Sequence, residues 1–334
     1  MEEALWRLGR RGRRCRPFCE RAGVRPRGAS QRLQRALVDF GAEESFTRAA
    51  ARVREHYGIE VAVRRLRRVT LRHAAAMNGL EGAGPKRPAA CVVTEMDGSM
   101  IPVVVASAQG ADRRKGKQLI WREARLCLAR EKESVTARYG ATLGSAEWAG
   151  AMWARTARAA GVGPQTAVHG VGDGAPWIVE AFGEQFGGQG RYLVDFYHVS
   201  EYLGAAATTV APRASDRWRR RQMGRLLNNR VKGVLQSLAA HVEKPSAEEA
   251  PVRTAHRYLS ERRGHLDYAG ARAQGLPIGS GEIESGHRHV VQQRLKLAGA
   301  WWKEPNAEAM LGLRVARANQ LWEHYWQRSP VTQN

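Results

Sequence analysis

Three acidic residues of this chain lie where the sequence pattern changes from one kind of secondary structure to another. Asp97 closes an apolar run, Asp173 follows a later one, and Glu284 lies near the start of a helical pattern. Because the ends of neighbouring strands meet at one edge of an open sheet, folding can gather these residues across long sequence separations. Gathered carboxylates bind hard divalent cations such as Mg²⁺, and two such ions support phosphodiester cleavage. These residues therefore predict phosphoryl-transfer chemistry.

Two of the segments that carry these acids also have a simpler interpretation. The pair Asp97-Gly98 is typical of a hairpin turn. The segment Gly170–Ala175 matches the dinucleotide-binding pattern G-x-G-x-x-A, and Asp195 follows it by about 20 residues. Against a dinucleotide site, Asp173 would place a negative charge in the pyrophosphate loop, and the cofactor would leave the basic charge of the chain unexplained.

Further polar residues lie close to these acids in the sequence. Asp195 also ends an apolar run, so it competes for the second acidic position, and His198 follows it. Glu282 is two residues from Glu284 on another helical face, and His287 lies about one turn beyond Glu284. Glu284 alone is also consistent with a helix-capping acid, and Glu284-x-x-His287 with half of a bundle metal site that lacks its second half. Asp195, His198, Glu282 and His287 are predicted as auxiliary site residues.

The elements that would position these residues form a mixed pattern in the middle of the chain. Apolar and alternating runs predict five strands, the first two joined by a turn at Gly98-Ser99: 91–97, 100–106, 119–128, 166–171 and 191–194. Amphipathic patterns predict helices over 145–160 and 177–186. Three strands that form a meander, followed by helix, strand, helix and strand, predict an α/β fold with a mixed sheet flanked by helices.

The rest of the chain is predicted to be helical. Residues 199–270 are rich in Arg and hold no strand candidate, with a break near Pro212, and a last long helix spans 306–326. Near the N-terminus, helices from Ser45 to Tyr57 and over 62–77 surround Gly58 and predict a helix-turn-helix-like region.

Basic side chains predict the partner. The chain has 334 residues, with 54 Lys and Arg against 32 Asp and Glu, so its net charge is +22. Such a surplus favours a polyanion, because each neutralised phosphate releases counterions. Double-stranded DNA is the predicted partner, with contacts from the outer face of the second N-terminal helix and from the segment after Glu284. The residues are Arg64, Arg65, Arg67, Arg68, Arg72, Arg288, Arg294 and Lys296.

The cysteines and the hydropathy exclude several other classes of protein. Four cysteines in a chain of this length do not indicate a disulfide framework, and no apolar run is long enough to span a membrane. Cys15 and Cys19 have no second Cys/His pair nearby, so no zinc site is predicted there. The expected location is a reducing compartment, the cytosol.

Five ordered motifs resemble one known family. They are Asp97-Gly, Trp121-Arg-Glu-Ala-Arg, Gly172-Asp-Gly-Ala-Pro-Trp-Ile, Asp195-Phe-Tyr-His and Gly279-Ser-Gly-Glu-Ile-Glu-Ser. Together they resemble the DDE transposases of bacterial insertion sequences, closest to the ISKra type. The resemblance implies an RNase H-like catalytic core in which Asp97, Asp173 and Glu284 hold two Mg²⁺ ions, replaceable by Mn²⁺. It also implies hydrolysis at the element ends, strand transfer into target DNA, and a homodimer or larger assembly during synapsis.

The resemblance also assigns the parts of the chain. The predicted parts are a basic arm (1–43), a helix-turn-helix-like region (44–80), the first part of the core (89–212), a helical insertion (213–275) and the second part of the core (276–327). Two alternatives stay open. One is a DNA-binding protein whose RNase H-like core is inactive or has nuclease activity alone, and the other is a dinucleotide-binding enzyme that uses Gly170–Ala175.

Overall fold

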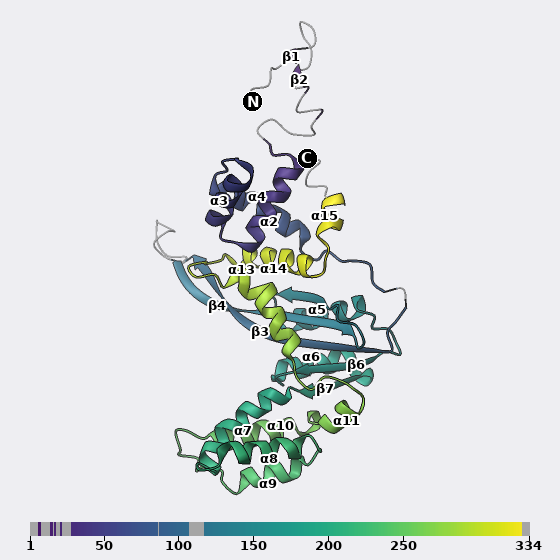
Figure 1. The fold of residues 1–334 in the computed structure, drawn as a ribbon, viewed down its shortest axis with the longest axis vertical. Helices are drawn as coiled ribbons and strands as arrows, with labels where there is room; N and C mark the ends of the chain where they lie inside the picture. The colour runs from purple at the N-terminus through teal and green to yellow at the C-terminus, as the bar shows by residue number, and fades with distance from the viewer. Residues whose placement is uncertain are drawn as a thin grey trace. The chain divides into compact units, whose positions relative to one another are not determined.

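The computed structural model describes residues 28–85, 87–106 and 117–328, with short pieces at 6–7, 14–15, 17 and 21. The chain divides into two compact units (Figure 1). Unit 1 contains Met1–Gly82, Met100–Arg122 and His289–Asn334, and unit 2 contains Ala83–Ser99 and Glu123–Arg288. Both units are therefore discontinuous in sequence. Cys19 and the side chain of Cys15 lie outside the described residues.

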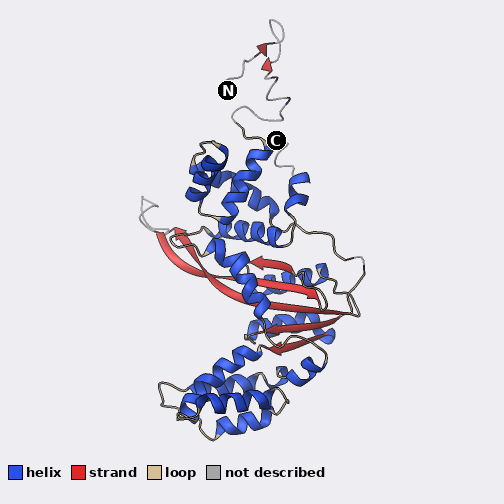
Figure 2. Cartoon of the chain, in the orientation of Figure 1, coloured by secondary structure: helices blue, strands red, loops and turns tan. Residues whose placement is uncertain are grey.

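A five-stranded mixed sheet contains the core strands, in the order β5-β4-β3-β6-β7 (Figure 2). Strand β4 pairs antiparallel with β5, whereas β3 pairs parallel with β6, and β6 parallel with β7. The prediction of an α/β fold with a mixed sheet flanked by helices is confirmed. The bounds are β3 Cys91–Ala106, β4 Lys117–Glu131, β5 Arg138–Thr142, β6 Ala167–Gly172 and β7 Gly190–Val194.

The first strand differs from its prediction. We expected a hairpin turn at Gly98-Ser99, but β3 continues through it as one strand, and Gly98 lacks the positive φ that such a turn needs. Gly98 is required for another reason, because a Cβ there would lie 2.1 Å from Oε1 of Glu123. Asp97 therefore lies within a long strand and does not end one. The third antiparallel strand is β5, which the sequence pattern did not reveal.

Two predicted helices cover one face of the sheet. Helix α5 (Ala146–Ala159) is capped by Ser145, and α6 (Pro176–Phe186) begins with its proline. Trp153 of α5 is fully buried against Phe182 and donates its indole N–H to Oγ1 of Thr94, at 2.5 Å. Because side chains alternate along a strand, Glu95 and Asp97 point to the opposite face.

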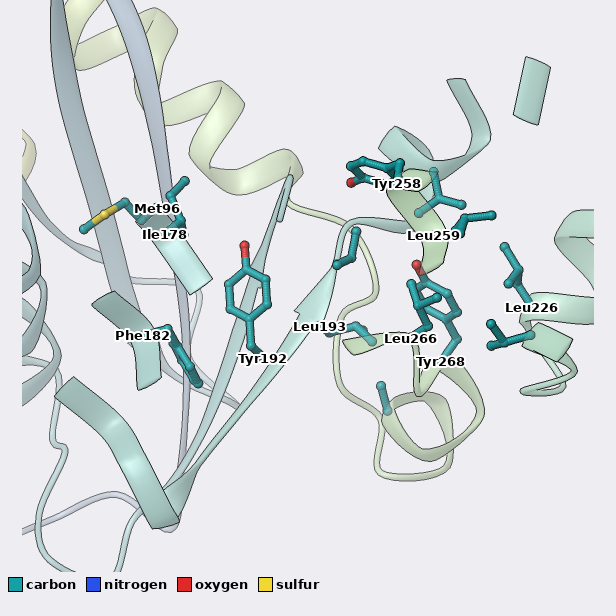
Figure 3. Close-up of a cluster of buried hydrophobic side chains, with 14 of the residues drawn as sticks. Met96, Ile178, Phe182, Tyr192, Leu193, Leu226, Tyr258, Leu259, Leu266 and Tyr268 are labelled. Carbon is teal, nitrogen blue, oxygen red and sulfur yellow. The ribbon is translucent and has the colours of Figure 1, made fainter. Parts of the chain in front are cut away.

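All elements between Phe196 and Ala273 are helical, as predicted for this segment. They are α7 Phe196–Val210, α8 Ser215–Leu226, α9 Val231–Ala239, α10 Pro251–Glu261, η2 Arg263–His265 and α11 Tyr268–Ala273. Leu226, Leu259 and Tyr268 from these helices belong to the same buried cluster as Leu193 of β7 (Figure 3). The insertion and the sheet therefore share one hydrophobic core in unit 2.

Unit 1 is mainly helical, and two predictions about it are wrong. Residues 31–43, which were assigned to the basic arm, form helix α2 (Gln31–Glu43), which Ser30 caps and which buries Leu37. The predicted last helix is two helices, α14 (Glu304–Ala318) and α15 (Trp322–Arg328), because Gln320 has a φ of +60°. Helices α3 (Phe46–Tyr57) and α4 (Val63–Met77) match their predictions, with Gly58 left-handed at the end of α3. No helix among the described residues is long and apolar enough to cross a membrane.

Candidate active site

Asp97 is the centre of a group of carboxylates in unit 2. The pKa of Asp97 is raised to about 6, chiefly by burial. The Gly98 N–H, 2.7 Å from Oδ1, acts against this rise, and the nearby charges of Asp173, Glu123 and Glu284 add smaller increases. These acids are therefore close enough to repel one another. The structure brings together Asp97, Asp173 and Glu284, the three acids singled out in the sequence.

Asp173 lies in the tight loop that follows β6. Its carboxylate accepts the backbone N–H of Ala175 at 2.8 Å, and the next residue, Gly174, has a φ of +74°. Two side chains from the helical insertion bind the loop. The Tyr258 hydroxyl donates to the Asp173 carbonyl at 2.5 Å, and Nε of Arg262 donates to the Gly174 carbonyl at 2.7 Å. The insertion therefore helps to position the second acid.

Glu284 lies on a helical segment that we call the Glu helix, residues 281–295. It consists of α12 (Gly281–Gly286), a π-helical part η3 (His287–Gln292) and α13 (Gln293–Leu295). A π-helical turn inside an α-helix is often found at functional sites. Glu284 is exposed, and its side chain has no hydrogen bond or ion pair with a described residue.

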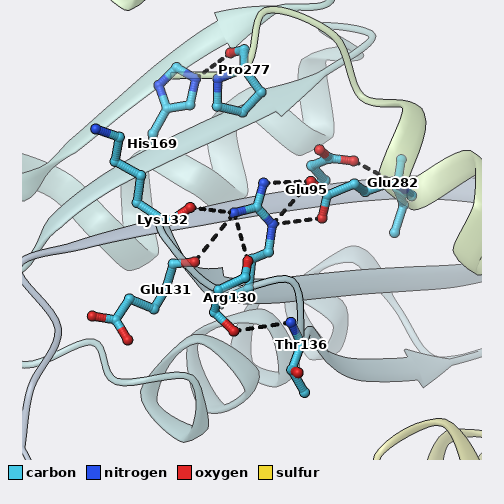
Figure 4. A network of polar contacts seen from close by, with 10 residues as sticks. Glu95, Arg130, Glu131, Lys132, Thr136, His169, Pro277 and Glu282 are labelled. Carbon is cyan, nitrogen blue, oxygen red and sulfur yellow. Dashed lines mark hydrogen bonds and ion pairs between the residues drawn. The ribbon is translucent and has the colours of Figure 1, made fainter. Parts of the chain in front are cut away.

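Three other acids position the start of the Glu helix. The carboxylate of Asp195 accepts the Ser280 N–H at 2.7 Å, and the carboxylate of Glu95 accepts the Ile283 N–H, also at 2.7 Å. Glu282 forms a two-pronged ion pair with Arg130 of β4, with distances of 2.5 to 3.0 Å (Figure 4). Because the first N–H groups of a helix lack partners within the helix, these contacts fix where it begins.

Asp195 and Asp173 have different roles in the structure. Asp195 is buried and caps α7 by accepting the N–H groups of Tyr197 and His198, while its other oxygen accepts both the N–H and the hydroxyl of Ser280. Four protein donors therefore occupy its carboxylate. Among the described residues, one hydrogen-bond donor contacts the Asp173 carboxylate, which is only partly buried and so retains the capacity to bind a cation.

Glu95 is a site residue that sequence reasoning missed. Its side chain is fully buried, and burial raises its pKa to about 8, with a smaller opposing effect from the Ile283 N–H. A signal was present, because an acid within the apolar run Cys91-Val-Val-Thr-Glu95 needs a specific partner when buried. Only the fold reveals that this partner is the backbone of the Glu helix.

The two histidines have different surroundings. His287 on the Glu helix is buried, with Nε2 3.4 Å from Oδ2 of Asp97. His198 on α7 is half-buried and pairs with Glu201 at 3.2 Å. His287 therefore contacts the acidic group directly, whereas the side chain of His198 pairs with Glu201 of its own helix.

The predicted DNA-binding residues also differ in exposure. Arg64, Arg67, Arg68 and Arg72 of α4 are exposed, as are Arg288 and Lys296, and Arg65 is partly buried. Arg294, which was predicted to contact DNA, is buried. Its Nε donates to the Gly41 carbonyl at 3.0 Å, and its guanidinium lies 4.7 Å from the ring centroid of Phe46 and 4.8 Å from that of Trp302. Arg294 therefore serves the packing of unit 1.

The donor set fits a hard divalent cation by its chemistry. Among the described residues, none of Asp97, Asp173 and Glu284 forms an ion pair with a Lys or Arg, and the basic group beside them is the imidazole of His287 at Asp97. Oxygen donors of this type are those that Mg²⁺ prefers. Within the described part of the chain, however, no group of three or more His, Cys, Asp or Glu side chains is arranged as a ready metal site.

The glycines of the segment Gly170–Ala175 are used for packing. A Cβ at Gly170 would lie 2.4 Å from the ring of Phe182, and one at Gly172 would lie 2.5 Å from the Tyr192 hydroxyl. A pyrophosphate needs open backbone above such glycines. The segment therefore lacks the space that the dinucleotide alternative requires.

Comparison with known proteins places the chain in a family. No curated protein matches it. A solved structure described as "Drosophila P element transposase strand transfer complex" is distantly similar, with 9% identity, 93% of this chain and 84% of that chain covered, and a TM-score of 0.35. Residues 25–325 match the model of the Uncharacterised protein family (UPF0236), and the chain belongs to this family.

Proposed function

We propose that the chain is the DNA transposase of an insertion sequence. The observation that carries the proposal is the acidic group formed by Asp97, Asp173 and Glu284 in unit 2 of a strongly basic chain. The first reaction breaks a phosphodiester bond at an element end with water and leaves a 3′-hydroxyl. That hydroxyl then attacks a phosphodiester of the target DNA in line, and the target's own 3′ oxygen leaves. The assignment to the ISKra type rests on the five sequence motifs alone.

The three acids have a shared role in this proposal. Asp97, Asp173 and Glu284 would hold two Mg²⁺ ions, or Mn²⁺, which when bound supply charge stabilisation at the reacting phosphate and activate the attacking oxygen. Glu95, Asp195 and the Arg130–Glu282 pair keep the Glu helix in place and so orient Glu284. His287 contacts Asp97 and limits the directions in which that carboxylate can point.

DNA is the proposed partner of unit 1 as well. The exposed arginines of α4 lie on the face opposite the buried Leu66, Val69 and Ala74, as expected for a second helix that contacts DNA in a helix-turn-helix-like region. Arginine suits phosphate contacts because its guanidinium donates in a fixed, forked geometry. Joining two element ends requires at least a homodimer during synapsis.

Nicking of supercoiled plasmid in the presence of Mn²⁺ tests the proposal. We expect the wild type to nick, and Asp97→Asn, Asp173→Asn and Glu284→Gln to fall to the level of a protein-free control while binding a labelled duplex as tightly as the wild type. Each substitution keeps the size of the side chain and removes the negative charge that the cation needs.

The matched control is Glu180→Gln, on the exposed surface of α6. This variant makes the same chemical change away from the acidic group, so it should nick like the wild type. Full nicking by any of the three triad variants would remove that residue from the mechanism. Equal nicking by all of them would overturn the proposal.

A further inference from the structure

Helix α8 of the insertion carries five arginines, which the structure divides into two groups. Arg219 donates to Oγ of Ser200 at 2.9 Å, and Arg225 donates to the Gly233 carbonyl and to Oγ of Ser237. These two arginines pack the insertion together. The other three, Arg217, Arg220 and Arg221, are exposed.

The exposed arginines lie on one face of the helix. Their spacing, i, i+3 and i+4, places them side by side over about 6 Å of the helix axis. Nε of Arg220 donates a long hydrogen bond, 3.4 Å, to the Asp216 carbonyl of the same helix, and its terminal nitrogens take no part in this bond. The next position on this face is Gly224, where an added Cβ would meet nothing within 4 Å. No side chain therefore covers the helix surface directly at this position among the described residues.

The charge of the insertion is concentrated at this helix. Residues 211–232 hold eight Arg and Lys but one acid, Asp216, whereas residues 233–273 hold six Arg and Lys and five acids. Asp216 pairs with Arg219 at 3.6 Å. On the helices packed against α8, the acid of α7 is Glu201, which pairs with His198, and α9 carries Lys232 and no acid. Nothing on these elements neutralises the exposed face.

We propose that this face, which we call the α8 basic face, binds the phosphate backbone of double-stranded DNA. It consists of Arg217, Arg220 and Arg221, with the exposed Arg213, Arg230 and Lys232 beside them in the sequence. The inference rests on the proposed function, because it supplies that function with a second DNA contact within unit 2. Phosphate contacts carry no sequence information, so this face contributes affinity and register, and not recognition of the element ends.

The salt dependence of duplex binding by the full-length chain tests this inference. Each phosphate contact contributes about −0.9 to the slope of log K against log salt. The variant Arg217→Ala/Arg220→Ala/Arg221→Ala should therefore have a slope less negative by roughly 2 to 3 and a weaker affinity at low salt. The variant with Lys at the same three positions should keep the wild-type slope, because it keeps the charges.

The control removes the same amount of charge elsewhere. Arg158, Arg257 and Arg272 are exposed arginines on α5, α10 and α11, so replacing these three with Ala matches the net charge without altering the α8 basic face. An alanine variant of α8 whose slope equals that of the wild type, or a control variant that loses as much slope, would overturn the inference.

Plasmid nicking distinguishes a failure of this inference from a failure of the proposed function. If the wild type nicks in a triad-dependent way while the α8 variant binds DNA normally, the inference fails and the proposed function stands. If the wild type neither binds duplex nor nicks plasmid, both fail together.

Discussion

At the residue scale, the environments of Asp173 and Asp195 decide which of them can bind a cation. Both follow parallel strands, and the sequence alone left them in competition. In the structure, Asp195 is surrounded by four hydrogen-bond donors, whereas among the described residues Asp173 has one. A carboxylate whose oxygens are already occupied inside the protein would lose those bonds on binding a cation. Asp195 is therefore a positioning residue.

This difference predicts that the two alanine variants lose unequal amounts of free energy of unfolding. Asp195→Ala removes the cap of α7 and leaves the buried N–H and hydroxyl of Ser280 without their acceptor, so we expect the free energy of unfolding to fall by about 2 to 4 kcal/mol. Asp173→Ala removes one partly exposed hydrogen bond and should cost about 1 kcal/mol or less. Urea unfolding of both variants measures the difference. Equal costs would show that Asp195 does not have the structural role described here.

The sequence singled out the three acids of the proposed site, but it did not reveal the contacts that support them. Asp97, Asp173 and Glu284 stood out because motifs surround them, and the fold brings them together. Glu95 and Arg130 did not stand out, because a side chain that supports a distant backbone group leaves no periodic pattern. Arg294 was predicted to contact DNA because a basic residue in a helical pattern is usually exposed. Its burial depends on neighbours that only the fold reveals.

At the element scale, the long strand β3 shows a local turn signal that the tertiary structure overrides. A Gly after an Asp predicts a turn, but the strand continues through Gly98 because Glu123 of β4 lies against it. Helices with caps were predicted closely, as with Ser145 before α5 and Ser45 before α3. Caps are local signals, whereas the pairing of β4 with β5 depends on residues that only folding brings together.

Helices α2, α4 and α15 meet at a buried histidine in unit 1. Nδ1 of His73 lies 2.8 Å from the Tyr325 hydroxyl, and its Nε2 lies 3.0 Å from Oε1 of Gln34. A neutral ring that donates from Nε2 and accepts at Nδ1 satisfies both contacts. Burial, with a smaller effect of the Arg72 charge, lowers the pKa of His73 to about 4.

The stability of this junction should depend on pH. Below about pH 6.5 the unfolded chain takes up a proton at His73 that the folded chain does not bind, so the free energy of unfolding falls as the pH drops towards 4. The free energy of unfolding changes by about 1.4 kcal/mol per pH unit in this range. The loss of that free energy caused by His73→Gln should therefore be about 2 kcal/mol smaller at pH 5 than at pH 7. Urea unfolding of wild type and variant at the two pH values measures this. A cost that does not change with pH would mean that the pKa of His73 is the same in the folded and the unfolded chain.

At the scale of the whole molecule, the N-terminal helices depend on the end of the chain. Helix α14 packs against α2 and α4 within unit 1. The packing is close at Gly312, where a Cβ would lie 2.8 Å from Cα of Asn78, the residue that ends α4. A glycine in the middle of a helix is unfavourable by itself, so this close approach explains its presence.

Gly312→Ala should therefore destabilise the protein even though alanine favours helices. We expect a loss of about 1 to 3 kcal/mol, because the clash involves backbone that cannot move aside. The matched control is Gly183→Ala in α6, where a Cβ meets nothing within 4 Å and alanine should stabilise by up to about 1 kcal/mol. Thermal unfolding of both variants compares them, and a Gly312→Ala protein at least as stable as the wild type would contradict the packing described here.

The discontinuity of unit 1 has a consequence for the order of events during synthesis. Helices α2 to α4 leave the ribosome early, but the helix that covers them, α14, is translated more than 200 residues later. At elongation rates of about 5 to 20 residues per second, roughly 10 to 40 seconds pass before the helix that packs against them is made. A nascent or prematurely terminated chain therefore lacks a finished unit 1. If this unit grips the element ends, a protein that acts on its own gene would not capture DNA until translation had passed α14.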